Sequence, residues 1–399
     1  MSTASDKARF YLEQLVPEFK EFEKKKIFSK DEISAILKKR SDFEHRINAT
    51  GPKPADYARY AEYEMNLDTL RRKRIKRLGV KSPMHTGQRR VFFILDRATK
   101  KFHGDISLWM QYIEYARRQK AYKKLGQIFM NALRLHPTKV ELWICAARYA
   151  LEDNGDMTQA RSYMQRGLRF CKSSKLLWLQ YAKLEMIYIT RIATRQQILG
   201  LDGTRKSPSA TADDSATDPN ADVIALPVVT EEDINPSLEK EDGVDEAALE
   251  NLNSTPALTG AIPIAIFDAA MRQFGNDTAI GHDFYTMVSE FTKTPCLHRV
   301  LSHIVESMMA TDPTSSHAQI CYIMLPTAAI EITSAQFPRA FGTSLSRLKE
   351  CNNQNTTGNK SLPKEVVAWL QPLVTTEGLD PALCKVMTAT LRNAQGSLS

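Results

Sequence analysis

The sequence is poor in glycine and cysteine and has no long apolar run. Among 399 residues there are 17 glycines and 6 cysteines. The glycines form neither G-x-x-x-x-G-K-[ST] nor G-x-G-x-x-G, so no phosphate-binding loop is indicated. No segment approaches the roughly 18 uninterrupted apolar residues of a membrane span, and the first nine residues lack the apolar core of a signal peptide. We expect a soluble, intracellular protein.

Residues arranged for catalysis or metal binding are also scarce. The six cysteines never form the close pairs of zinc sites, so we expect reduced thiols, most of them buried. H-E-x-x-H and G-x-S-x-G are absent, and the eight histidines do not gather at metal-ligand spacing. The sequence therefore predicts no catalytic site, no metal, no cofactor and no small-molecule substrate.

Three tryptophans recur at a nearly constant interval. Trp109, Trp143 and Trp178 are separated by 34 and 35 residues, close to the roughly 34-residue period of helix-turn-helix repeats. Asp105 and Ser174 precede two of them by four residues and are suitable helix N-caps. Each such unit buries its apolar face only against its neighbours, so the spacing predicts an all-α solenoid.

Other residues repeat in register with the tryptophans. Aromatic residues follow at steps of three, and small or aliphatic residues precede by ten or eleven positions, which keeps each set on one helix face. A tyrosine series at 57, 60 and 63, followed by Glu64, predicts an atypical first repeat. Because the aromatic residues repeat with aliphatic neighbours, we interpret them as core and not as base-stacking residues. The predicted repeat core is Trp109, Tyr112, Tyr115, Ala132, Leu133, Trp143, Tyr149, Leu168, Trp178 and Tyr181.

The charge is unevenly distributed. The net charge is +8, yet residues 200–257 contain 14 acidic and 3 basic residues, so the rest of the chain is strongly basic. The acidic segment has too few large apolar residues to fold, and we expect a disordered loop inserted within a repeat. The apolar island at 223–229 is either a docking motif or a segment that lies back on the solenoid. The basic remainder favours a polyanionic partner such as RNA, or acidic proteins.

The first fifty residues predict two amphipathic helices. Their apolar faces carry Leu12, Leu15, Phe19, Phe22, Ile33 and Leu37, and Ser29 with Glu32 forms a capping box. Two interpretations remain open. The pair either caps the first repeat or inserts into a groove of a partner protein.

A dense basic run follows in the first repeat. It consists of Arg71, Arg72, Lys73, Arg74, Lys76 and Arg77. The run either contacts phosphates, serves as a nuclear import signal, or forms a solvated helix face.

The C-terminal third predicts further helices with a weaker repeat. Phe284 is expected at the tryptophan position, and helices are expected at 298–309, 318–335, 341–351 and 364–370, followed by a frayed terminus. The resulting domains are an N-terminal helical segment at 1–50, repeats at 51–199, the acidic loop at 200–257 and C-terminal repeats at 258–399.

The Trp-x-x-Tyr-x-x-[Tyr/Leu] pattern resembles the half-a-tetratricopeptide (HAT) repeat of RNA-processing complexes, which implies a right-handed solenoid of helix pairs. The segments 27–33, 38–44 and 57–64, with Leu70 to Arg74, more closely resemble the HAT-repeat subunit family of the UTP-B subcomplex of the small-subunit processome. That resemblance implies a nucleolar scaffold in pre-rRNA processing with no catalytic role. It also implies WD-repeat propeller proteins, pre-ribosomal RNA and the U3 small nucleolar RNA as partners.

Two alternatives stay open at this point. The chain could be a HAT scaffold of an mRNA splicing or 3′-end processing complex, because repeat architecture alone does not fix function. It could also bind RNA directly without sequence preference, which a steep salt dependence would reveal.

Overall fold

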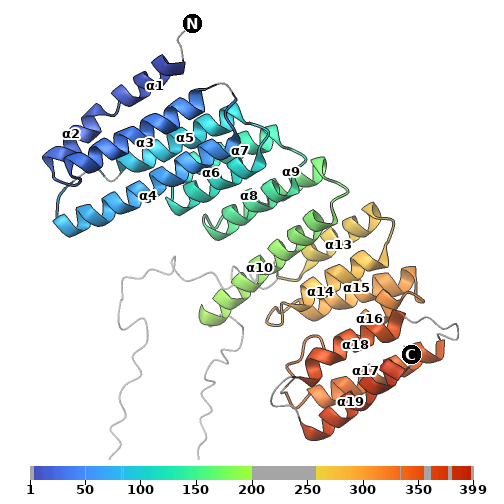
Figure 1. The fold of residues 1–399 in the computed structure, drawn as a ribbon. Helices are drawn as coiled ribbons and strands as arrows, with labels where there is room; N and C mark the ends of the chain where they lie inside the picture. The colour runs from blue at the N-terminus through green and yellow to red at the C-terminus, as the bar shows by residue number, and fades with distance from the viewer. Residues whose placement is uncertain are drawn as a thin grey trace, which may run out of the picture. The chain divides into compact units, whose positions relative to one another are not determined.

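The computed structural model describes residues 4–49, 51–81, 83, 85–199, 258–332, 334–354, 361–375 and 380–396. Within these ranges the regular elements are helices, and no strand is present, which confirms the predicted all-α helical repeat. The predicted acidic loop and its apolar island at 223–229 lie outside the described residues. The chain divides into two compact units, Met1–Ala146 and Ala147–Ser399, which are described separately (Figure 1).

Unit 1 is a stack of antiparallel helices in which sequence neighbours pack together. Helix α4 packs on α5 and α6 on α7, while α1 lies along α3 (Figure 1). The predicted Ser29–Glu32 capping box starts α3, and Asp105 caps α6 by accepting from the Ser107 N–H. The helices are α1 (Ala4–Glu13), α2 (Val16–Lys24), α3 (Lys30–Asn48), α4 (Pro54–Leu78), α5 (His85–Lys101), α6 (Ile106–Arg118) and α7 (Tyr122–Leu135). Helix α8 (Val140–Glu152) contains the boundary between the units.

Each of the three spaced tryptophans makes the same hydrogen bond. The indole N–H of Trp109, Trp143 and Trp178 donates to the carbonyl oxygen six residues earlier, at 3.0, 2.8 and 3.1 Å. That carbonyl belongs to the loop before the helix, so the bond fixes the helix start against its incoming chain. The ring meanwhile adds apolar area to the core.

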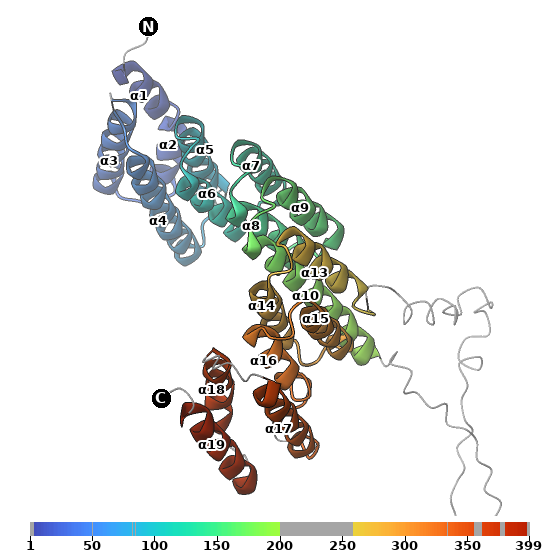
Figure 2. The ribbon, with the colours of Figure 1, turned by 90° about the vertical axis from the view of Figure 1, so that its right-hand side faces the viewer.

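Unit 2 contains α9 to α19, and its helices α10 and α13 are separated in the sequence by residues 200–257. Helices α10 and α13 pack against each other although residues 200–257 separate them, and α14 lies beside α10 (Figure 2). Lys183 Nζ bonds Glu290 at 2.8 Å, and the hydroxyls of Thr190 and Thr294 lie 2.8 Å apart. The helices are α9 (Met157–Phe170), α10 (Lys175–Leu199), α13 (Ala261–Gln273), α14 (Thr278–Ser289), α15 (Leu297–Thr311), α16 (Ser316–Met324), α17 (Phe337–Gln354), α18 (Ser361–Val374) and α19 (Pro381–Gly396).

Beyond Trp178, the tryptophan position continues in unit 2 without tryptophan. In α16, Gln319 lies four residues after the N-cap Ser315, as Trp178 lies four after Ser174. The buried amide of Gln319 donates to the Pro313 carbonyl at 3.0 Å, again six residues earlier. The amide thus replaces the indole as donor.

Two predictions for the C-terminal third were wrong. Asp277 caps α14, so Gly281 occupies the tryptophan position and Phe284 lies three residues later. A Cβ on Gly281 would come within 2.6 Å of Met308 Sδ, which shows how closely α14 and α15 approach. The helix expected at 318–335 ends at Met324, just before Pro326. Helix α19 was not predicted, and the final residues that were expected to fray, beyond Gly396, lie outside the described residues.

We predict that Trp143→Phe lowers the free energy of unfolding by about 1 kcal/mol, because the Pro137 carbonyl loses its donor while most ring area remains. The matched control is Trp369→Phe, since Trp369 contacts the Phe341 ring instead. Urea unfolding followed by circular dichroism measures both changes. Equal losses in the two variants would contradict a specific role for the indole bond.

Candidate functional site

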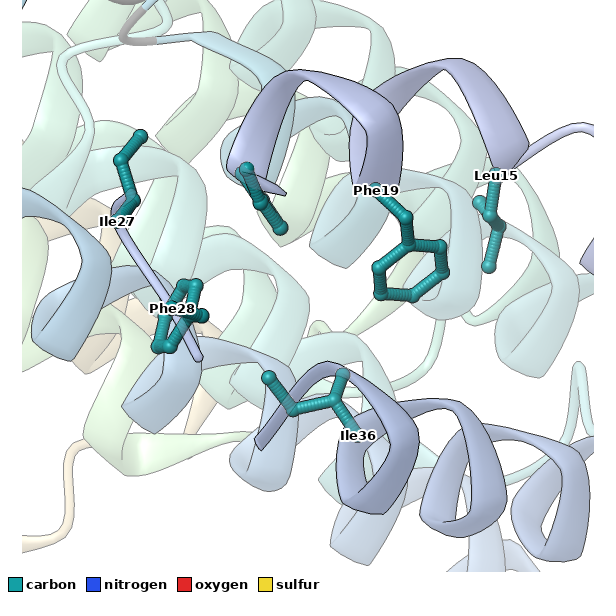
Figure 3. Close-up of a cluster of buried hydrophobic side chains, with 6 residues drawn as sticks. Leu15, Phe19, Ile27, Phe28 and Ile36 are labelled. Atoms are coloured by element: carbon teal, nitrogen blue, oxygen red, sulfur yellow. The ribbon is translucent and has the colours of Figure 1, made fainter. Parts of the chain in front are cut away.

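The apolar residues of the first two predicted helices pack within the chain. Leu15, Phe19 and Phe22 are buried in one cluster with Ile27, Phe28 and Ile36 (Figure 3). The remaining predicted contact residues, Leu12, Ile33 and Leu37, are partly buried against the same cluster. This arrangement is the one that the capping interpretation describes. A partner protein that used these side chains would have to open the cluster first.

The basic run on α4 divides into paired and exposed residues. Arg71 donates to Asp68 at 2.8 and 3.1 Å and to the Pro83 carbonyl at 3.0 Å, and Arg72 lies 2.7 Å from the second oxygen of Asp68. Arg74 donates to both oxygens of Glu32 at 2.7 Å. Three of the six predicted cations thus hold the structure of unit 1 together.

Arg74 also contacts the N-terminal cluster. It lies over the Phe28 ring, 4.8 Å from its centroid, and donates to the Ile27 carbonyl at 3.1 Å. It therefore joins α4 to that cluster.

The other three cations of the run, Lys73, Lys76 and Arg77, are exposed. A contact of the run with RNA or an import receptor would depend on these three exposed cations.

The pair of Glu32 and Arg74 shifts the titration of both groups. The hydrogen bond from Arg74, together with the one from the Ser29 backbone N–H, lowers the pKa of Glu32 from 4.5 to about 2. The hydrogen bond to Glu32 raises the pKa of Arg74. A carboxylate with a lowered folded-state pKa stabilises the fold above its unfolded pKa, and this contribution is lost as the pH falls through the folded value.

We predict that Arg74→Gln is less stable than the parent protein at neutral pH and that the difference shrinks between pH 4.5 and 2. The loss at neutral pH should not exceed about 1 kcal/mol, because the Glu32 side chain is 41% exposed and solvent screens the pair. Unfolding measured at several pH values tests this, with Lys73→Gln as the control. A difference that is unchanged down to pH 2 would show that the ion pair contributes nothing.

A buried ion network lies between α2, α3, α4 and α5. Arg40 donates to both oxygens of Glu64 at 2.7 and 2.8 Å and lies 3.5 Å from Glu18. Arg90 donates to Glu18 and lies 3.8 Å from Glu64. Burial alone would lower the pKa of Arg40, but attraction to Glu64 and Glu18 outweighs it and raises the pKa. Two acids and two arginines thus balance in the core.

The same ion pair recurs in unit 2. Arg161 donates to both oxygens of Glu185 at 2.7 and 2.8 Å, with the 24-residue separation of Arg40 and Glu64. Glu185 follows Trp178 by seven residues, and Glu64 follows Tyr57 by the same interval. In the repeats of Trp109 and Trp143 that position holds Ala116 and Ala150, which are fully buried. The tight site therefore takes either a small residue or a paired glutamate.

We predict that Glu64→Ala lowers the free energy of unfolding of unit 1 by about 3–5 kcal/mol, because Arg40 keeps a buried charge without its main partner. The double variant Arg40→Met/Glu64→Met should recover most of that loss, since the remaining Glu18 and Arg90 still balance. Glu62→Ala on the exposed face is the control. Equal losses in the single and double variants would contradict this account of the network.

Eight of the ten predicted repeat-core residues are buried, while Leu168 and Trp178 are half-buried.

In the described part of the chain no three metal-ligating residues gather into a site, and no described helix is long and apolar enough to cross a membrane. None of the six cysteines forms a disulfide. Burial raises the pKa of four of their thiols, Cys171, Cys296, Cys321 and Cys351, which keeps them protonated at neutral pH.

The fold and these surfaces define an all-α helical-repeat protein whose N-terminal unit is held together by buried ion pairs. Residues 12–97, from α1 through most of α5, match the family model of U3 small nucleolar RNA-associated protein 6. The predicted resemblance to that protein is thereby confirmed.

Relatives in several organisms agree with this match. The chain is 37% identical over 236 residues to U3 small nucleolar RNA-associated protein 6 of Schizosaccharomyces pombe, which covers 57% of this chain and 48% of the relative. It is 33% identical to the mouse homologue over 190 residues, which covers 47% of this chain and 32% of the relative. It is 26% identical to the Dictyostelium discoideum homologue over 382 residues, or 90% of this chain and 57% of the relative. In each of these three matches the chain thus spans less than two thirds of the relative's length.

Proposed function

We propose that this chain is a non-catalytic scaffold subunit of the small-subunit processome. In this proposal it acts within the UTP-B subcomplex and is needed for processing of pre-rRNA and maturation of small-subunit rRNA. Its partners are WD-repeat propeller proteins of UTP-B, and pre-ribosomal RNA and the U3 small nucleolar RNA within the assembly. Its place is the nucleolus, and its HAT-like helix pairs provide the binding surfaces.

The match of residues 12–97 carries the proposal. These residues include the N-terminal cluster, the ion network and the paired half of the basic run. The similarity therefore covers a packed, charge-balanced region and not one short motif. The relatives are named for association with the U3 small nucleolar RNA, which favours this assembly over the splicing and 3′-end complexes that use similar repeats.

The chemistry of the described residues also supports a scaffold. The buried glutamates of the network are held by arginines, and burial keeps the buried thiols protonated. Solenoids offer extended surfaces on which several weak contacts add up to stable attachment. A scaffold that holds several partners would bind them on these extended surfaces.

We predict that the tagged full-length chain, purified from cells at moderate salt, recovers propeller subunits together with the U3 small nucleolar RNA and pre-rRNA. Mass spectrometry and RNA sequencing identify both classes, with the untagged strain as control. Recovery of splicing or polyadenylation factors in place of propeller proteins would contradict the proposal.

A further inference from the structure

A polar groove of about 360 Å³ lies between α5 and α7 in unit 1. Four polar side chains of its lining come from α7: Lys124, Gln127, Asn131 and Arg134. Their spacing of three, four and three residues places them along one face of the helix. This face was not predicted from the sequence, because its cations are separated by amides and do not form a run.

The charge of the groove is positive. Lys100, Lys124 and Arg134 line it together with one acidic residue, Asp96. The carboxylate of Asp96 accepts from Lys100 at 2.8 Å, so it is already neutralised within α5. Lys124 and Arg134 therefore leave two positive charges along the α7 side.

A tyrosine with a buried hydroxyl lines the same groove. Tyr112 of α6 lines the groove and is 2% exposed, and its hydroxyl has no hydrogen-bond partner among the described residues. At the same repeat position in α10, the hydroxyl of Tyr181 accepts from the Gln165 amide at 3.4 Å. The residue sixteen positions before Tyr112 is Asp96, which bonds Lys100 instead. Burial, with the nearby charge of Asp96, raises the pKa of Tyr112, so its hydroxyl keeps its proton to donate.

The separation of the cations indicates the kind of ligand. Lys124 and Arg134 are ten residues apart, which is about 15 Å along a helix. One small anion cannot contact both, whereas a polymer with repeated negative charges can. Between them, Gln127 and Asn131 offer donors and acceptors together. Ribose hydroxyls also donate and accept, whereas the carboxylates of an acidic peptide only accept.

We propose that the groove between α5 and α7 binds the sugar-phosphate backbone of single-stranded RNA. Lys124 and Arg134 contact separate phosphates, Gln127 and Asn131 contact riboses between them, and the Tyr112 hydroxyl donates from the groove floor. No base is read, so binding tolerates any sequence. This inference rests on the proposed function for the choice of RNA as the polymer, and it assigns the contact to a surface other than the basic run.

The test measures binding of a labelled oligouridylate to the isolated full chain by fluorescence anisotropy over a range of salt concentrations. We expect Lys124→Gln/Arg134→Gln to weaken binding several-fold. The slope of log affinity against log salt should become shallower by about 1.4, because each single-strand phosphate contact contributes about 0.7. The matched control is Lys73→Gln/Arg77→Gln, which removes two exposed cations of the basic run.

A second pair of variants tests the hydroxyl. Tyr112→Phe should weaken binding with an unchanged salt slope, because no charge is removed, and it should leave thermal stability unchanged because the hydroxyl is unpaired in the fold. Tyr181→Phe, at the same repeat position, should leave binding unaffected.

Three outcomes would overturn the proposal. The control pair could weaken binding while the groove pair does not, which would return RNA binding to the basic run. A labelled oligoglutamate could bind as tightly as the RNA and depend on the groove cations, which would identify an acidic protein partner. The parent chain could also fail to bind oligouridylate at low salt. Each result is obtained with isolated protein, so it is distinguishable from failure to recover U3 small nucleolar RNA or propeller subunits from cells.

Discussion

The bond from each tryptophan indole to the carbonyl six residues earlier is the constraint on which the stack depends. It holds the first turn of a helix against the loop that enters it, as in Trp143 with Pro137. The position seven residues after the aromatic is buried in each of these repeats. That position then accepts Ala116 or a glutamate that an arginine fully neutralises, as in Glu185 with Arg161. Gln319 shows that an amide can supply the donor without the ring.

Charge in the N-terminal unit is used first for structure. Arg40, Arg71 and Arg74 each form an ion pair with a carboxylate within the unit. Their positive charges are therefore neutralised inside the fold. Buried pairs of this kind fix which helices meet, because a shifted helix would leave a charge unpaired in the core. Part of the positive charge that remains available lies along α7, apart from the exposed cations Lys73, Lys76 and Arg77 of α4. The proposed scaffold role would combine a charge-balanced core with a separate cationic groove for RNA.

The sequence predicts the local features of this fold well. Spaced tryptophans, N-caps such as Asp105 and the Ser29 capping box depend on neighbours a few residues away, and the structure contains them. Gln319 was missed because its amide makes the same hydrogen bond as the indole but does not belong to the aromatic pattern. Gly281 was missed because glycine has no side chain that could repeat in the pattern, although the close approach of α14 and α15 requires it. The division of the basic run depends on partners such as Glu32, 42 residues from Arg74, and the groove exists only once α5 and α7 are neighbours. Pairing over such distances is set by tertiary packing, which composition does not encode.

Ultraviolet crosslinking of the full chain to single-stranded RNA, followed by mass spectrometry of the crosslinked peptides, tests the central claim most directly. The claim is that half of the basic run is structural and that RNA lies between α5 and α7. The account predicts crosslinks in the peptides that carry Lys100, Lys124 and Arg134. Crosslinks confined to the peptides around Lys73, Lys76 and Arg77 would contradict it.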